Sequence, residues 1–219
     1  MPPVLMSWSG GKDSAVALYE LQQAGREIAA LMTMVVGDTD RVSVHGVPRE
    51  LVRRQAAALG LPLHEVVLSS RPSNVEYEAA IGALFAAQRA DGVETVAFGD
   101  LFLEDIRAYR DGLCARLGMA PLYPVWGRDT RAFVTEAQAA GFRTVLCSVD
   151  LARLNLDFAG RELDAALVAD LPQDVDPCGE NGEFHTFVFE APNFVHPIPI
   201  ALGAREARDG FGYCEIAAA

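Results

Sequence analysis

The stretch Val4-Leu5-Met6-Ser7-Trp8-Ser9-Gly10-Gly11-Lys12-Asp13-Ser14-Ala15-Val16-Ala17-Leu18 begins as an apolar run of strand length and then turns polar. Beyond the polar residues, apolar side chains recur at helical spacing. A strand that leads through a glycine-rich turn into a helix forms an anion site, because backbone N–H groups and the positive end of the helix dipole meet there. Gly10 and Gly11 permit close backbone approach, Lys12 adds a charge, and the hydroxyls of Ser9 and Ser14 add donors.

The spacing of this turn differs from that of two better-known nucleotide loops. A Walker A loop has four residues between its first glycine and its Gly-Lys-Ser/Thr ending, whereas here the glycines are adjacent and Asp13 follows the lysine. The dinucleotide fingerprint Gly-x-Gly-x-x-Gly is also absent. The residues therefore predict a phosphate-binding turn of another type, with an ordinary strand–helix turn as the alternative.

Length, composition and charge limit the size of the core and the kinds of partner that the chain can have. The 219 residues, of which 51% are hydrophobic, suffice for one core and a smaller lobe. The net charge of −12 argues against a large nucleic-acid footprint. Arg49, Arg53 and Arg54 form either a local basic patch or, as we prefer, a solvated helix face.

The cysteines and the apolar runs indicate a cytoplasmic protein. No two of the four cysteines form a Cys-x-x-Cys pair; they are Cys114, Cys147, Cys178 and Cys214. We therefore expect reduced thiols rather than a zinc or iron–sulfur site. No apolar run approaches the roughly 20 residues of a membrane span. The amino terminus also lacks the pattern of a secretory signal.

Strand and helix patterns alternate through the first part of the chain. Strands are expected at residues 4–8, 28–36, 63–68 and 95–98, and helices at 14–24, 49–59, 73–90 and 106–117. This order predicts an α/β fold with a parallel, Rossmann-like sheet, in which ligands bind at the carboxyl ends of the strands. Ser7, Met32, Gly99 and Asp100 should therefore gather at one edge with residues 9–14.

The pattern changes after about residue 120. Pro121, Pro124, Trp126 and Gly127 form a loop-like joint, followed by an expected helix at 130–140, a strand at 144–149 and a helix at 161–171. The last 50 residues are rich in proline, glycine, asparagine and aromatic residues and contain no long helical pattern. We therefore predict two units, residues 1–120 and a smaller α+β lobe of residues 121–219.

A second polar cluster lies in the stretch Asp176-Pro177-Cys178-Gly179-Glu180-Asn181-Gly182-Glu183-Phe184-His185-Thr186-Phe187. Glu180, Glu183 and His185 are side chains that bind cations or act as general acids and bases. A solvated turn without function is the alternative from the residues alone.

Ser9 to Ser14 resembles the SGGKDS loop of the ATP pyrophosphatase (PP-loop) superfamily. Combined with the GENGEFHT segment at 179–186, it resembles the diphthine–ammonia ligase family. Between the two motifs the resemblance continues through Gly99-Asp100, Arg107, Cys114, Leu117-Gly118, Pro121-Leu122 and Pro124-Val125-Trp126. Phe184 replaces a usual tyrosine, Val125 replaces a leucine, and residues 101–109 depart from the family pattern, which bears on the acceptor substrate.

The resemblance implies a PP-loop domain, similar to the adenine nucleotide alpha hydrolases, joined to a substrate-binding lobe. It implies that ATP and Mg²⁺ activate a carboxylate as an acyl-adenylate, and that ammonia then displaces AMP. The implied ATP site comprises Ser7, Ser9, Gly10, Gly11, Lys12, Asp13, Ser14, Met32, Gly99 and Asp100. Lys12, Asp13, Glu183 and His185 would be catalytic, and Trp126, Glu180, Glu183, His185 and Thr186 would bind the acceptor. Asp13 and Asp100 would hold Mg²⁺, with a helix cap at residue 14 as the alternative for Asp13.

The expected nitrogen donor is free ammonia, present as ammonium, or another amine. The chain begins Met1-Pro2-Pro3 and has no cysteine before Cys114, so an in-chain glutaminase is not expected. The implied acceptor is diphthine on elongation factor 2, and a small carboxylate metabolite is the alternative. A tRNA-modifying PP-loop enzyme and a non-catalytic adenine-nucleotide regulator are further alternatives. A homodimer is expected, although no specific sequence feature supports it.

Overall fold

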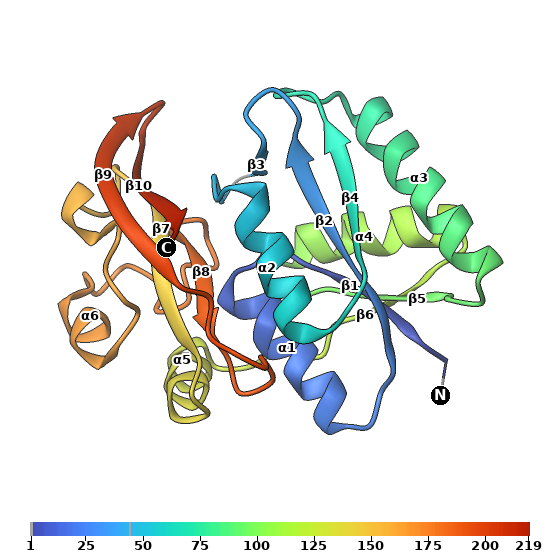
Figure 1. The fold of residues 1–219 in the computed structure, drawn as a ribbon, viewed down its shortest axis with the longest axis horizontal. Coiled ribbons are helices and arrows are strands. Elements are labelled where there is room, and N and C mark those ends of the chain that lie inside the picture. The colour runs from blue at the N-terminus through green and yellow to red at the C-terminus, as the bar shows by residue number, and fades with distance from the viewer. Residues whose placement is uncertain (1, 44) are drawn as a thin grey trace.

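The computed structural model describes residues 2–43 and 45–219, and these form two sheets (Figure 1). The first sheet has the order β3-β2-β1-β5-β6, with β4 paired to β2. All its pairings are parallel except that of β3 with β2. Its strands are β1 (Val4–Ser7), β2 (Ile28–Val36), β3 (Arg41–Val42), β4 (Leu63–Leu68), β5 (Thr95–Ala97) and β6 (Ala120–Leu122).

Four helices cover both faces of this sheet: α1 (Lys12–Gln23), α2 (Arg49–Leu59), α3 (Asn74–Ala90) and α4 (Glu104–Leu117). Val4 and Met6 pack on the side of α1, whereas Leu5 packs on the side of α3 and α4, as side-chain alternation along a strand requires. Gly60 and Gly118 adopt left-handed φ at the ends of α2 and α4. The predicted α/β fold with a parallel sheet is confirmed.

The structure corrects three local expectations in the first sheet. The short strands β3 and β6 were not predicted, and β6 extends the sheet to Leu122, inside the expected loop-like joint. Strands of two or three residues are too short to show a periodic pattern. Helix α1 begins at Lys12 and not at residue 14. Gly11 is its N-cap, so the alternative role of Asp13 as a cap is wrong.

The second sheet is antiparallel, with the order β8-β7-β10-β9. Together with α5 (Thr130–Ala139), a 3-10 turn (Leu156–Phe158) and α6 (Ala165–Asp170) it makes up the C-terminal lobe, which confirms the predicted α+β class. Its strands are β7 (Arg143–Asp150), β8 (Phe184–Glu190), β9 (Ile200–Arg208) and β10 (Phe211–Ala218). Of these, only β7 was predicted.

The helix expected at 161–171 is shorter than the sequence pattern suggested. Glu162 forms a bridge with Val145 of β7, so the chain is extended at this point. The Asp164 carboxylate then accepts a hydrogen bond from the backbone N–H of Leu167 at 2.8 Å and caps α6. The tertiary pairing with β7 therefore overrides the local helical pattern.

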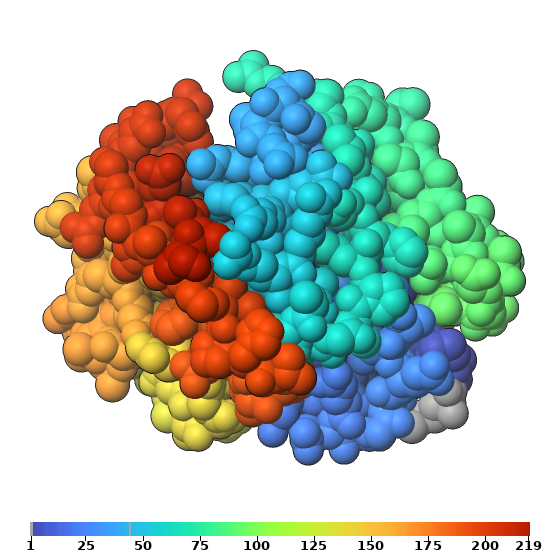
Figure 2. All heavy atoms as spheres, viewed as in Figure 1, coloured from blue at the N-terminus to red at the C-terminus, as the bar shows by residue number. Residues whose placement is uncertain are grey.

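Backbone pairing joins the C-terminal lobe to the glycine turn. The Val188 N–H of β8 donates to the Gly10 carbonyl at 2.9 Å. The buried Gln55 amide of α2 donates to the same carbonyl at 3.0 Å and to the Val188 carbonyl at 2.6 Å. Its oxygen accepts from the Trp8 indole at 3.0 Å. Strand β8 is thus fixed against the turn, and Figure 2 shows the C-terminal strands packed against the N-terminal half.

The arginines of α2 are paired with acidic side chains. Arg49 and Arg53 both bond to Glu65, at 2.8 Å and 2.7 Å, and Arg54 bonds to Glu50 at 2.7 Å. These contacts neutralise the three arginines, so they do not form the local basic patch that was one of the two interpretations of the sequence. None of the helices in the described ranges, residues 2–43 and 45–219, is long and apolar enough to cross a membrane.

Glu65 should make the stability of the fold sensitive to acid. Hydrogen bonds from Arg49 and Arg53 lower the pKa of Glu65 from 4.5 to about 2. The stabilisation is therefore present above about pH 4.5 and is lost as the pH falls through about 2. After solvent screening of the exposed Arg53, we expect Glu65→Gln to lower the free energy of unfolding at neutral pH by about 2 kcal/mol.

Urea unfolding at neutral pH and at about pH 3 measures this dependence. The Glu65→Gln variant should show a smaller loss of stability between the two conditions than the wild type, because the contribution of Glu65 is removed. Glu50→Gln is the matched control, because its exposed i,i+4 pair with Arg54 should contribute only about 0.3–0.5 kcal/mol. Equal effects of the two substitutions would contradict the role given to Glu65.

Candidate functional site

The glycine turn lies at the amino end of α1, where the sequence predicts an anion site. Gly10 adopts a left-handed φ of 80°, and a Cβ there would lie 2.8 Å from the Gln55 side-chain oxygen. The Ser14 hydroxyl donates to the Gly11 carbonyl at 3.0 Å and lies 3.2 Å from the Ser9 hydroxyl. The positive end of the α1 dipole is therefore next to two hydroxyls.

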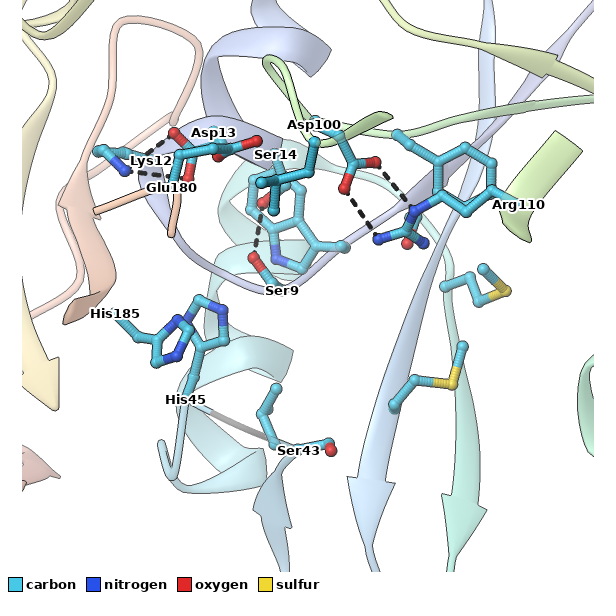
Figure 3. Close-up of a pocket in the computed structure, with 18 of the residues that line it drawn as sticks. Ser9, Lys12, Asp13, Ser14, Ser43, His45, Asp100, Arg110, Glu180 and His185 are labelled. Carbon is cyan, nitrogen blue, oxygen red and sulfur yellow. Dashed lines mark hydrogen bonds and ion pairs between the residues drawn. The ribbon is translucent and has the colours of Figure 1, made fainter. Parts of the chain in front are cut away.

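A cavity of about 410 Å³ opens in front of this turn, at the carboxyl ends of β1, β2 and β5 (Figure 3). The C-terminal lobe forms its opposite wall. Most of the residues predicted for the site line it together: Ser7, Ser9, Lys12, Asp13, Ser14, Met32, Gly99, Asp100, Glu180, His185 and Thr186. Gly10 and Gly11 form the backbone of the turn and are not among the lining residues.

Lys12 is a buried cation at the centre of the site. Its side chain is 3% exposed, lies 2.9 Å from Asp13 Oδ1, and donates to the Cys178 carbonyl of the C-terminal lobe. Burial disfavours its charge, but neighbouring acidic groups, Asp13 first, outweigh burial and raise the pKa of Lys12. The ammonium group therefore stays charged beside the turn. Its backbone N–H donates to Thr186 Oγ1 at 3.1 Å, which fixes the second lobe to the same residue.

The carboxylates around Lys12 outnumber it. Burial, then repulsion by Asp13, raises the pKa of Glu180 from 4.5 to about 7, and its Oε1 accepts from the Leu101 N–H at 2.7 Å. Burial also raises the pKa of Asp13. Asp100 is paired with Arg110 at 2.9 Å. Glu180 therefore titrates near neutral pH, as a general acid or base must.

Two groups of cavity residues were missed by sequence reasoning. His45 and Arg110 are polar, whereas Tyr77, Ile81 and Phe85 of α3 form an apolar wall near Met32 and Met34. His45 lies beyond the carboxyl end of β2. Ligands bind at the carboxyl ends of strands in a parallel sheet, so this position could have identified His45 as a site residue. The apolar wall carries no local signal, because its spacing is that of an ordinary buried helix face.

Besides Gly10 and Gly11, two further predicted site residues, Glu183 and Trp126, do not line the cavity. Glu183 is 3% exposed, and its carboxylate accepts from the Asp176 N–H at 3.0 Å, the Asn181 N–H at 3.0 Å and the Asn181 side-chain amide at 3.1 Å. Trp126 packs against Tyr123, with Arg107 4.6 Å from its ring centroid. The catalytic role of Glu183 and the substrate contact of Trp126 therefore find no support in this geometry, because both side chains are engaged elsewhere.

Glu183→Gln should destabilise the fold and leave the chemistry in place. The amide removes the charge and one acceptor oxygen from three hydrogen bonds, so we expect a loss of about 1.5–3 kcal/mol in unfolding free energy. Urea denaturation measures the change, and Glu206→Gln on the exposed strand β9 is the control. Wild-type stability combined with lost turnover would instead indicate a catalytic Glu183.

Comparison with known proteins gives the family. The model of the diphthamide synthase N-terminal domain matches residues 3–121, and that of the C-terminal domain matches residues 129–219. A diphthine–ammonia ligase from Danio rerio is 28% identical, over 88% of this chain and 84% of that protein. One from Homo sapiens is 25% identical, over 85% and 78%.

Among solved structures, one similar chain is a predicted subunit of a tRNA methyltransferase from Methanocaldococcus jannaschii. It is 18% identical with a TM-score of 0.43, over 67% of this chain and 80% of that chain. The two family models cover both lobes, including the glycine turn and the loop that faces it across the cavity. The chain therefore belongs to the diphthamide synthase family.

Proposed function

We propose that this protein is an ATP-dependent, AMP-forming diphthine–ammonia ligase. One observation carries the proposal: the glycine turn with the buried Lys12 faces Glu180 and His185 across one cavity. A phosphate site and acid–base groups are the two components that an adenylating ligase needs. The names of the relatives supply the substrates, diphthine and ammonia.

The turn would act on the departing pyrophosphate. A carboxylate oxygen of the acceptor attacks the α-phosphorus of ATP, the bond from that phosphorus to the bridging oxygen breaks, and pyrophosphate leaves with the electron pair. Negative charge thus accumulates on the leaving group beside Lys12 and the α1 amino end. Donors that are already oriented toward developing charge stabilise the transition state without reorganisation.

The residues present fit a magnesium ion held jointly with the nucleotide. Mg²⁺ in nucleotide sites binds one or two carboxylates together with phosphate oxygens. Asp13 and Asp100 supply two carboxylates to the same cavity, whereas residues 2–43 and 45–219 contain no cluster of three metal-binding side chains. We therefore assign Mg²⁺ to these two residues with phosphate oxygens as the remaining ligands, where it would offset phosphate charge.

The apolar wall formed by α3 and the β2 methionines suits the nucleoside part of ATP. Met32, Ile81 and Phe85 present apolar surface to the cavity next to the phosphate turn. Planar aromatic groups such as adenine gain affinity by burial against such surfaces. The arrangement places a base at one end of the cavity and phosphates at the other.

Mass spectrometry of elongation factor 2 tests the function. The factor, carrying diphthine, is incubated with the protein, ATP, Mg²⁺ and ¹⁵N-labelled ammonium chloride. We expect the diphthine carboxylate to become an amide that carries the label, with one AMP and one pyrophosphate released per amide. An unlabelled factor under these conditions would overturn the proposal. AMP release with a small carboxylate in place of the factor would indicate that the acceptor is a metabolite.

A further inference from the structure

Two imidazole rings from different parts of the chain face each other in the cavity. His45 lies in the loop between β3 and α2, and His185 lies on β8 of the C-terminal lobe. Their ring centroids are 4.9 Å apart, with 43° between the ring planes (Figure 3). Of the two rings, only His185 belongs to the acid–base groups of the proposed ligase, and His45 has no role in them.

Hydrogen bonding determines the tautomer of His45. Its Nδ1 lies 3.0 Å from the Thr186 carbonyl oxygen. A carbonyl oxygen accepts only, so Nδ1 carries the proton and Nε2 keeps a free lone pair. The same ring is held close to the phosphate turn, since a Cβ on Gly11 would lie 2.8 Å from His45 Cε1. An acceptor nitrogen is therefore placed beside the amino end of α1.

The surroundings of the pair disfavour positive charge. Burial, opposed by the hydrogen bond to Thr186 and aided by Lys12, lowers the pKa of His45 to about 4. Burial, then His45 and Lys12, lowers the pKa of His185 to about 3. In the described residues no carboxylate bonds to either ring. The charged groups that line the same cavity are Lys12, Asp13, Asp100, Arg110 and Glu180.

We propose that His45 and His185 form a binding site for uncharged ammonia, with His45 Nε2 as the base that takes a proton after attack. The proposal rests on the ligase function proposed above. Neutral ammonia donates an N–H to an imidazole lone pair, whereas ammonium has no lone pair with which to attack the acyl carbon. The lone pair of ammonia then remains free to attack.

The step balances without a further reactant. The ammonia lone pair forms a bond to the acyl carbon of the adenylate, and the bond from that carbon to the phosphate oxygen breaks, so AMP leaves with the electron pair. The new nitrogen is then positively charged and gives one proton to His45 Nε2, which returns it to solvent. A positively charged nitrogen on an acyl carbon is a far stronger acid than ammonium, so an imidazole of low pKa suffices as the base.

Kinetics of the wild-type protein test the charge state of the bound amine. With the diphthine-bearing factor as acceptor, the apparent KM for total ammonium should rise about tenfold for each unit by which the pH is lowered below the pKa of ammonium, because only ammonia binds. Hydroxylamine, which is already neutral near pH 7, should show a KM that hardly changes over the same range. A pH-independent KM for ammonium would overturn the proposal.

His45→Asn tests the base, because the Asn amide keeps a donor toward the Thr186 carbonyl and removes Nε2. We expect carboxylate-dependent exchange of labelled pyrophosphate into ATP to stay within about twofold, since adenylation needs no amine. Amide formation should fall about 10²-fold. Equal loss in both assays would make His45 structural and overturn its role as base. Absence of exchange in the wild type would mean that the proposed ligase function itself fails.

A binding measurement separates the inference from turnover. The ¹⁵N resonance of His45 Nε2 in the full chain should move on addition of ammonium chloride at about pH 9 and stay unchanged at about pH 6. The Nδ1 resonance should carry a bound proton in both conditions. If neither imidazole responds at the higher pH, no ammonia site exists between them, whatever the fate of the ligase function.

Discussion

Replacing Lys12 with methionine should reduce the rate of pyrophosphate release by about 10²–10³-fold. Lys12 is the one lysine among 219 residues, and its buried ammonium lies beside the turn that would hold the leaving group. Methionine keeps much of the volume and removes the charge. The loss should appear in the turnover number more than in the KM for ATP, because the charge on the leaving group grows during bond breaking.

Exchange of labelled pyrophosphate into ATP measures this effect, with Arg131→Met on the exposed face of α5 as the control. Since all other cationic side chains are arginines, a lysine-directed acylating reagent also reports on Lys12. Pyrophosphate should protect Lys12 from the reagent, as read by peptide mass spectrometry. Full exchange activity in Lys12→Met would contradict the role given to the turn.

Gly99→Ala should disable the site while Gly112→Ala does not. Gly99 follows β5 where that strand meets the start of α1, and a Cβ there would lie 2.7 Å from the Asp13 carbonyl carbon and 2.8 Å from the Ser14 nitrogen. Both are backbone atoms in the first turn of the helix, so the strand or the phosphate turn must move. We expect about 1–3 kcal/mol of destabilisation and a loss of about 10²-fold in pyrophosphate exchange.

Gly112 is the matched control within α4. A Cβ there meets only Arg116 Nη1 at 3.7 Å, so the alanine variant should be more stable by about 0.5–1 kcal/mol and keep its activity. Urea unfolding and pyrophosphate exchange, measured on both variants, give the comparison. Similar behaviour of the two variants would show that the contact between β5 and α1 does not control the site.

Much of the N-terminal part of the fold followed from local sequence. The alternation of apolar strands and helices predicted the parallel sheet, because strand and helix periods are properties of short segments. The prediction failed for β3, β6 and three of the four strands of the C-terminal lobe. Residues 184–218 are paired across the lobe, and their proline- and glycine-rich flanks conceal the strand pattern.

The candidate site divides in the same way. Ser9 to Ser14 is contiguous, so the glycines, the cation and the helix start that make an anion cradle can be read directly from the sequence. Side-chain direction in the loop at 176–187 depends instead on contacts distant in sequence. The sequence grouped Glu180 with Glu183, but the fold places Glu180 at the cavity and turns Glu183 into its own loop.

The sequence by itself determined a glycine turn at the carboxyl edge of a parallel sheet and a second motif that belongs with it. Only the tertiary structure decided what faces the turn. The pairing of Val188 with Gly10 brings β8 to the start of α1, and this pairing sets His185 beside His45, a residue with no local motif. The physical reason is that the turn is built by neighbouring residues, whereas the opposite wall of the cavity is built by contacts between segments more than a hundred residues apart.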